Sequence, residues 1–265
     1  MRRALALAIL SLACRPRARP DDTPPEPTVD VPAPGDTPDT TDAPDAPAIS
    51  APIATVTALT GESSVGTALA TVGLPWRGGT VTVPRASSIT LRLTDGGSLT
   101  LRGPGAISPS RVNPAGIVLA QGTLSVEPDL TTHRAVSVET PLGRTLVSVG
   151  PSTLRLTERA LRLAGSTVTL WRAGVVARGV ALNPGSRGRT LLLRAHRAEA
   201  VDEDLTAAER ALDTDAGSDE VAALALSRAE AGLMAWSVSD PERAAREGRF
   251  ERLLAALRGG SSRAR

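Results

Sequence analysis

Hydrophobic and polar residues alternate with a period of two through most of residues 53–198, and this pattern predicts β-strands. The clearest case is the segment 89–101, in which apolar residues occupy every second position on both sides of an Asp95-Gly96-Gly97 turn. Short strands separated by such frequent turns favour a mainly β domain, either an antiparallel sandwich or a β-roll. No helical period of useful length interrupts them, which argues against a βαβ nucleotide-binding fold.

From residue 199 to residue 265 the apolar residues follow a helical period instead, so we expect a small C-terminal α-helical region. One continuous apolar stripe, with spacings of four and three residues, consists of Ala222, Leu226, Ala229, Leu233 and Trp236. It predicts a helix over about 218–236. We interpret the region as helices packed on themselves or against the β-domain, and a partner-docking element is the alternative.

Two further helices are indicated by their start signals. Thr206 and Glu209 have the spacing of a capping box, which predicts a short helix beginning at Thr206. Asp240 followed by Pro241 is typical of an N-cap and a first helical position, which predicts a third helix from there onward.

The first 13 residues have the anatomy of a signal peptide. Two arginines precede the apolar run Ala4–Ala13, which is too short to span a hydrocarbon core of ~30 Å but suits a secretion signal. Cys14, the only cysteine, follows directly and resembles the cysteine of a bacterial lipobox, although Ser11 stands where leucine is usual. We expect Cys14 to be lipidated and to anchor the protein through acyl chains alone. Ordinary secretion with an incidental cysteine is the alternative.

Residues 14–52 consist mainly of Pro, Asp, Thr and Ala. Dense proline blocks both helix and sheet, and like-charged aspartates repel one another and extend the chain. The composition therefore predicts a disordered tether, which we interpret as a spacer that holds a folded domain away from a membrane surface. A low-complexity segment without a role is the alternative.

The net charge of +2 hides strong local differences, and every basic residue is arginine. Residues 20–50 carry eight acidic and no basic side chains, whereas residues 51–198 carry 16 arginines against six acids. One cysteine and two histidines are too few for the usual metal sites, and a single cysteine excludes a disulfide framework. With only four aromatic residues, we do not expect a nucleic acid as partner.

The β-domain offers a candidate binding surface. Trp76 and Trp171 are able to stack on sugar rings. Four arginines lie beside inward-facing leucines on the predicted strands and must therefore face solvent: Arg92, Arg102, Arg155 and Arg162. Such a basic face binds an anionic envelope polymer or an acidic protein patch. We favour instead a solvated surface without a partner, with both tryptophans as core fillers.

The order of these fragments resembles the FecR-like sensor domain, named for the iron-dicitrate regulator. The matching fragments cover about residues 55–193 and read SSITLRLTDGGSLTL, IVLAQGTLSV, AVSVETPLGRTLVSVGPSTLRL and STVTLWRAGVVARGVALNPGSRGRTL. The shared turn residues are Asp95-Gly96, Gly122, Thr140-Pro141 with Gly143, Gly174 and Pro184-Gly185. The resemblance implies a periplasmic or surface β-domain that binds another envelope component. The family's signalling members have an anti-sigma segment and a transmembrane helix, where this chain has a signal peptide, a cysteine and a linker.

We predict that the protein is not an enzyme and holds neither a cofactor nor a metal. His133 and His196 are the only histidines, and no G-x-S-x-G elbow, Walker loop or dinucleotide-binding loop is present. We therefore expect an envelope-anchored, sensor-type interaction protein that binds an envelope protein. A binder of cell-wall or surface polysaccharide through the basic β-face is the alternative, and a hydrolase with an unrecognised site is the least favoured hypothesis.

Overall fold

The computed structural model describes residues 51–172, 178–193, 197–214, 219–236 and 240–263. All of them belong to one compact unit, which extends from Ile49 to Arg265. The predictions for the signal peptide, for Cys14, for His196 and for nearly all of the tether lie outside the described residues.

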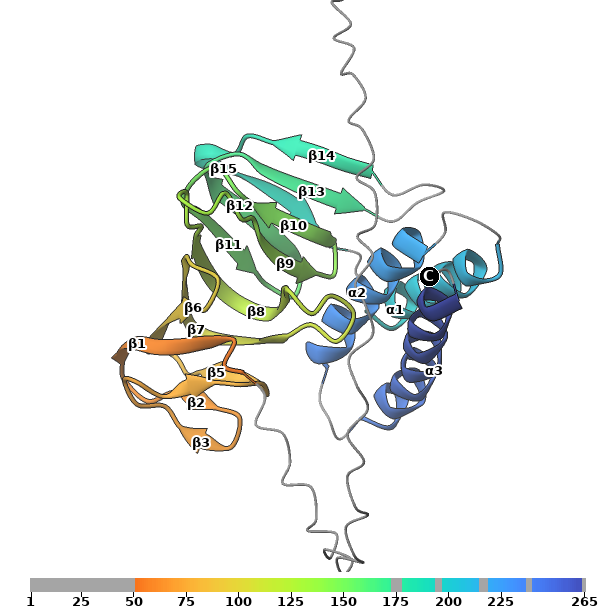
Figure 1. Cartoon of the computed structure of the whole chain (residues 1–265), viewed down its shortest axis with the longest axis horizontal. Coiled ribbons are helices and arrows are strands. Elements are labelled where there is room, and N and C mark those ends of the chain that lie inside the picture. Colours follow the sequence, from red (N-terminus) through yellow and green to blue (C-terminus); the bar gives the residue numbers. More distant parts are fainter. Residues whose placement is uncertain (1–50, 173–177, 194–196, 215–218, 237–239, 264–265) are drawn as a thin grey trace, which may run out of the picture. The chain divides into compact units, whose positions relative to one another are not determined.

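The described chain is mainly β, as the alternating pattern predicted (Figure 1). The strands are β1 (Ala54–Thr60), β2 (Ser64–Val65), β3 (Ala68–Leu69), β4 (Pro75–Trp76), β5 (Val81–Val83), β6 (Ser88–Leu93), β7 (Ser98–Pro109), β8 (Gly116–Glu127), β9 (Val136–Thr140), β10 (Gly143–Val147), β11 (Ser152–Leu156), β12 (Ala160–Gly165), β13 (Val168–Arg172), β14 (Arg178–Leu182) and β15 (Gly185–Leu192). The predicted Asp95-Gly96-Gly97 turn joins β6 to β7.

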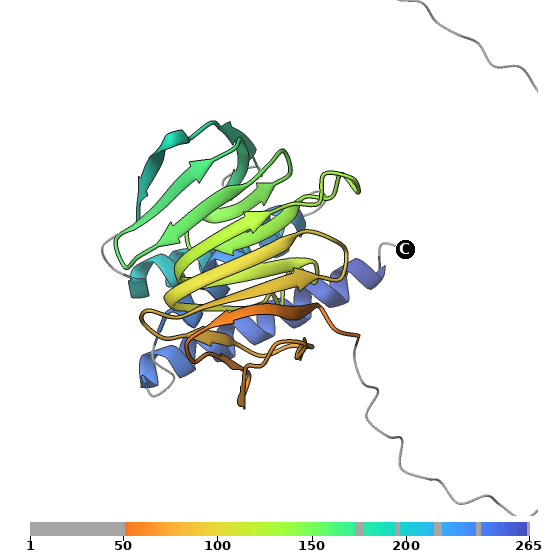
Figure 2. The ribbon, with the colours of Figure 1, turned by 90° about the vertical axis from the view of Figure 1, so that its left-hand side faces the viewer.

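The strands form one sheet that curls over on itself, because the two longest strands, β7 and β8, each belong to two parts of it (Figure 2). We call the order β1-β6-β7-β8-β11-β12-β15 the first layer and β14-β13-β10-β9-β8-β7-β5-β2-β3 the second layer. The strand pairs are antiparallel except for β8–β9, which is parallel. Apolar side chains from both layers share one core, which contains Leu91, Leu101, Leu124, Leu119 and Val138.

A bend in β7 and β8 allows each of these strands to form part of both layers. Leu119 and Leu124 of β8 both point into the core although they are five positions apart, an odd offset that would place them on opposite faces of a regular strand. The alternation must therefore break between them. The β7–β8 register shifts in this region, between Arg102 and Ile107. Gly122 lies at the shift with a φ of 106°, and a Cβ there would be 2.6 Å from the Cα of Gly105.

Three helices follow the sheet: α1 (Arg197–Leu212), α2 (Asp219–Met234) and α3 (Pro241–Arg263). Four of the five residues of the predicted stripe are buried in a second core together with residues of α1 and α3, such as Leu205 and Phe250. Trp236, the fifth, lies beyond the end of α2 and is partly buried against this core. Asp240 accepts a hydrogen bond from the Glu242 amide at 2.9 Å, so the predicted start of the third helix is confirmed.

The capping box predicted at Thr206 is wrong. Thr206 lies in the middle of α1, and its hydroxyl donates to the carbonyl of Asp202 at 2.8 Å, a bond from residue i to residue i−4 within a helix. The helix extends in front of Thr206 because Val201 and Leu205 are buried against the other helices. No helix in the described ranges is long and apolar enough to cross a membrane.

The helices pack on the outer side of the second layer, where α2 contacts β8, β9 and β10 (Figure 1). Val118 and Ala120 of β8 are buried although they point away from the β-core, because α2 covers them. The charged side chains of the first layer's outer face are exposed. The helical region therefore divides the outer surface of the sheet into a covered part and an open part.

Candidate functional site

The strand register brings three of the four predicted arginines into one row across the first layer. Arg102 of β7 lies opposite Thr123 of β8, and Thr123 lies opposite Arg155 of β11. Arg155 in turn lies opposite Arg162 of β12, and Arg162 lies opposite Thr190 of β15. The row therefore runs straight across the strands, which are ~4.8 Å apart. Arg102 and Arg155 are two strands apart, and Arg155 and Arg162 are on neighbouring strands. We call Arg102, Arg155 and Arg162 the basic row.

The charges of the basic row are not neutralised within the described part of the chain. All three side chains are exposed, and Arg162 donates a hydrogen bond to the carbonyl of Arg187 at 3.1 Å. Neither Arg102 nor Arg155 forms an ion pair with a described carboxylate. Arg155 and Arg162 face each other directly, and like charges at such a cross-strand pair are destabilising. An anion placed over the row relieves that repulsion.

Arg92 lies outside the basic row, in an acidic neighbourhood. It is opposite Ser98, which is itself opposite Glu127. The Thr131 hydroxyl, through its hydrogen bond, is the main cause that lowers the pKa of nearby Asp129, and the charge of Arg92 lowers it further. These carboxylates offset the charge of Arg92, so the structure separates this arginine from the other three.

Hydroxyl side chains occupy the outward positions next to the basic row. Thr90 and Thr100 are hydrogen-bonded across β6 and β7 at 3.1 Å, and Ser125 and Thr153 are hydrogen-bonded across β8 and β11 at 3.3 Å. Together with Thr123 they make the open face of the first layer a surface of hydroxyl and guanidinium groups. Such a surface offers hydrogen bonds as well as charge to a ligand.

The two tryptophans of the β-domain do not join this surface. Trp76 is fully buried in the β-core, and its indole N–H donates to the carbonyl of Gly79 at 3.1 Å, so the expectation of a surface-binding role for Trp76 is wrong. Trp171 is half-buried on β13 of the second layer, where its ring packs against Gly179 of β14. Its neighbour on the other side is Arg144 of β10, so it lies far across the sheet from the basic row.

A cavity of about 320 Å³ opens beside the basic row, at the bend of β7 and β8. Arg102, Thr123 and Arg155 line it on the side of the row, and Glu158 and Ala235 line it on the side of the helices. It shares Glu158 and Ala235 with a larger cavity of about 590 Å³ at the end of the sheet. The row and the hollow beside it form the candidate binding site.

The described titratable residues have structural partners or lie alone on the surface. Glu139 and Glu230 are buried, but Arg144 pairs with the first at 2.8 Å and Arg111 with the second at 3.1 Å. His133 is exposed in the loop before β9. Among the described residues no three His, Cys, Asp or Glu side chains gather where they could hold a metal ion.

Comparisons of the chain with protein-family models, with curated proteins and with solved structures found no match. The resemblance to FecR-like domains therefore rests on the sequence fragments alone.

Proposed function

We propose that this protein is a non-enzymatic binding protein of the bacterial cell envelope, whose FecR-like β-domain binds another envelope component through the basic row. The alignment of Arg102, Arg155 and Arg162 on an open sheet face supports this proposal most directly. Three exposed guanidinium groups without described carboxylate partners attract an anionic surface and hold it by charge-assisted hydrogen bonds.

The proposed location rests on the first 14 residues. An apolar run of ten residues followed by the only cysteine suits export and attachment through a lipidated Cys14. The mass of the protein extracted from membranes tests this part, since acylation adds the mass of the acyl chains to Cys14. An unmodified Cys14 in that material contradicts the anchor and leaves the binding proposal intact.

The partner is an envelope protein with an acidic surface, and an anionic polysaccharide is the second candidate. The hydroxyl groups of Thr90, Thr100, Ser125 and Thr153 favour the polysaccharide, because they lie beside the basic row and can bond to sugar hydroxyls. The burial of Trp76 weighs against it, since a sugar-binding face usually offers an exposed aromatic ring. Crosslinking in intact envelopes, followed by separate analysis of captured proteins and captured glycans, distinguishes the two.

The triple variant Arg102→Gln, Arg155→Gln, Arg162→Gln tests the basic row itself. We expect it to lose the crosslinked partner and to weaken binding to that partner by about 100-fold, since each charge-assisted contact contributes ~1 kcal/mol or more. Binding by the unchanged protein should fall steeply as salt rises, because the charges are exposed and screened.

The matched control is Arg85→Gln, Arg134→Gln, Arg210→Gln, which removes the same charge from exposed sites elsewhere. It should bind within about threefold of the unchanged protein. Equal losses of binding in both triple variants would show that only the net charge of the protein matters. Binding that does not weaken as salt rises would contradict a role for the basic row.

A further inference from the structure

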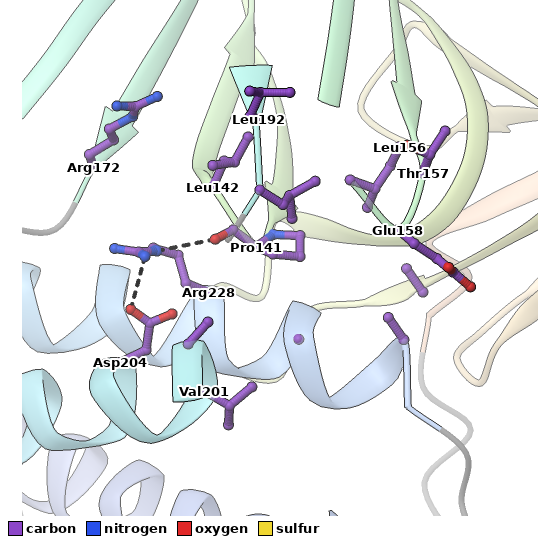
Figure 3. Close-up of a pocket in the computed structure, with 15 residues that line it drawn as sticks. Pro141, Leu142, Leu156, Thr157, Glu158, Arg172, Leu192, Val201, Asp204 and Arg228 are labelled. Carbon is purple, nitrogen blue, oxygen red and sulfur yellow. Dashed lines mark hydrogen bonds and ion pairs between the residues drawn. The ribbon is translucent and has the colours of Figure 1, made fainter. Parts of the chain in front are cut away.

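The larger cavity, of about 590 Å³, lies between one end of the sheet and the helices α1 and α2 (Figure 3). The sheet forms one wall, with Pro141 and Leu142 from the turn between β9 and β10 and Leu156 from the end of β11. Helices α1 and α2 form the other wall, with Val201 and Gly232. Its volume lies within the range of ~300–1,000 Å³ that is typical of small-molecule sites. It shares lining residues such as Leu156 and Glu158 with the hollow beside the basic row, but none of that row's arginines lines it.

The middle of this cavity is apolar. Leu142, Leu156, Leu193 and Val201 line it, and Leu192 lines it while 78% of its surface is exposed. A large apolar side chain that is so exposed at the wall of a cavity is a surface that a ligand can cover.

Several polar side chains along the same walls already have partners. Arg228 forms an ion pair with Asp204 at 3.1 Å and donates to the carbonyl of Pro141 at 3.3 Å (Figure 3). The Thr157 hydroxyl donates to the carbonyl of Ala160 at 3.1 Å. An extended peptide would find few free partners for its backbone here, whereas a hydrocarbon chain needs none.

One end of the cavity is cationic. Arg172, the last residue of β13, lines the cavity, and Arg178, the first residue of β14, lies directly opposite it in the ladder. Both are exposed, and neither has an anionic partner in the described ranges. The residues between them, 173–177, contain no charged side chain in the sequence. Two facing arginines repel each other, so this end of the cavity favours an anion.

Two acidic side chains line the cavity: Asp204, whose charge is paired with Arg228 at 3.1 Å, and Glu158, which lies away from Arg172. Figure 3 shows Glu158 on the opposite side of the cavity from Arg172, with the leucines between them. An anionic head at Arg172 therefore does not meet Glu158, and a chain that extends from it passes along the apolar wall.

We propose that this cavity binds a single-chain anionic amphiphile, with its head at Arg172 and Arg178 and its hydrocarbon chain against Leu142, Leu192, Leu193 and Val201. A small anion would leave the apolar wall uncovered, and a neutral or cationic amphiphile would leave the facing arginines repelling each other. None of the three arginines of the basic row lines this cavity, so either proposal can fail without the other.

Calorimetric titration of the full chain with dodecanoate tests the proposal, with Cys14→Ser introduced to prevent acylation and keep detergent out of the assay. We expect one saturable site. Dodecyltrimethylammonium, which has the same chain length and the opposite charge, should bind at least about tenfold more weakly, and acetate should not compete.

Two variants distinguish the contribution of the anionic head to binding from that of the hydrocarbon chain. Arg172→Gln with Arg178→Gln should weaken dodecanoate binding about tenfold or more, while Arg85→Gln with Arg134→Gln, the matched loss of charge, should leave it within about twofold. Ala200→Phe fills the cavity from α1 and should abolish binding. The proposal is overturned if the cationic amphiphile binds as tightly as dodecanoate, or if the Arg172/Arg178 variant binds dodecanoate unchanged. Arg172 and Arg178 are exposed, so replacing them should leave the fold intact. The result for this double variant therefore tests the proposal even if Ala200→Phe does not fold.

Discussion

A single buried carboxylate joins the helical region to the sheet. Glu230 of α2 is 1% exposed and accepts hydrogen bonds from the Ser110 hydroxyl at 2.8 Å, from the Arg111 amide at 2.9 Å and from the Arg111 guanidinium at 3.1 Å. The same guanidinium lies over the ring of Phe250 in α3 at 4.7 Å and pairs with Glu251. The loop between β7 and β8 is therefore held by two helices at once.

Replacing Glu230 should be among the most destabilising changes in the molecule. Glu230→Ala leaves a buried hydroxyl, an amide and a guanidinium without their acceptor, which costs about 3–5 kcal/mol. Urea unfolding measures the loss. Glu62→Ala, at an exposed loop position, should change the free energy of unfolding by no more than about 0.5 kcal/mol. Similar values for the two variants would show that the Glu230 network does not stabilise the fold.

The sequence pattern could not reveal this role of Glu230. The residue lies beside Ala229 of the predicted apolar stripe, and a glutamate there would be assigned to a solvated helix face. Its hydroxyl partner, Ser110, is 120 residues away in the chain. Only the docking of α2 on the sheet brings the two together, and no local pattern encodes that docking.

At the scale of the element, the bend in β7 and β8 decides the architecture. Periodicity identified Leu99 and Leu101 as inward-facing and Arg102, Arg155 and Arg162 as outward-facing, and the structure confirms both sets. Alternation assigns a side chain to one face of a strand, but it does not say which strands are neighbours. The pairing of β11 with β8, which creates the basic row, depends on the bend and was not predictable from local periodicity.

A pair of glycine variants tests how closely the strands must approach at this bend. Gly122→Ala places a Cβ 2.6 Å from the Cα of Gly105 at a φ of 106°, so it incurs both backbone strain and a steric clash. Gly73→Ala has a similar positive φ of 90° but nothing within 4 Å of the added atom. We expect a loss of about 1–2 kcal/mol at Gly73 and about 3–5 kcal/mol at Gly122.

Thermal or urea unfolding of the two variants gives the comparison directly. The difference between them isolates the steric contact, since both carry the cost of a positive φ. If Gly122→Ala were no more destabilising than Gly73→Ala, the close packing of β7 and β8 at the bend would not be required for the fold.

At the scale of the whole molecule, two cores of different character are joined. The β-core contains large aliphatic side chains from both layers and Trp76. Five of the 12 buried residues of the helical core are alanine, against two of 26 in the β-core. Alanine buries little apolar surface, so the stability of the helical region depends more on the ion pairs that link α1 to α3. In these pairs Arg249 holds Glu209 and Arg246 holds Asp202 through two hydrogen bonds each.

We therefore expect acid to destabilise the helical region, in part by protonating Glu209. The hydrogen bonds from Arg249 lower the pKa of Glu209 below its usual value of 4.5. A carboxyl whose pKa is lowered by folding contributes stability above its unfolded pKa and loses that contribution as the pH falls through the folded pKa. Glu209→Gln should thus lower the free energy of unfolding at pH 7, by about 0.5 kcal/mol because the pair is partly exposed.

The measurement is the difference in stability between the unchanged protein and Glu209→Gln, followed by the helical circular dichroism signal from pH 7 to pH 3. We expect the difference to shrink as the pH falls below about 4.5 and to vanish once Glu209 is protonated in the folded state. Glu62→Gln, which removes an exposed carboxyl from a loop, should show no such pH-dependent difference. A difference that grew on acidification would mean that Glu209 is destabilised by its surroundings, which would contradict the paired arrangement of α1 and α3.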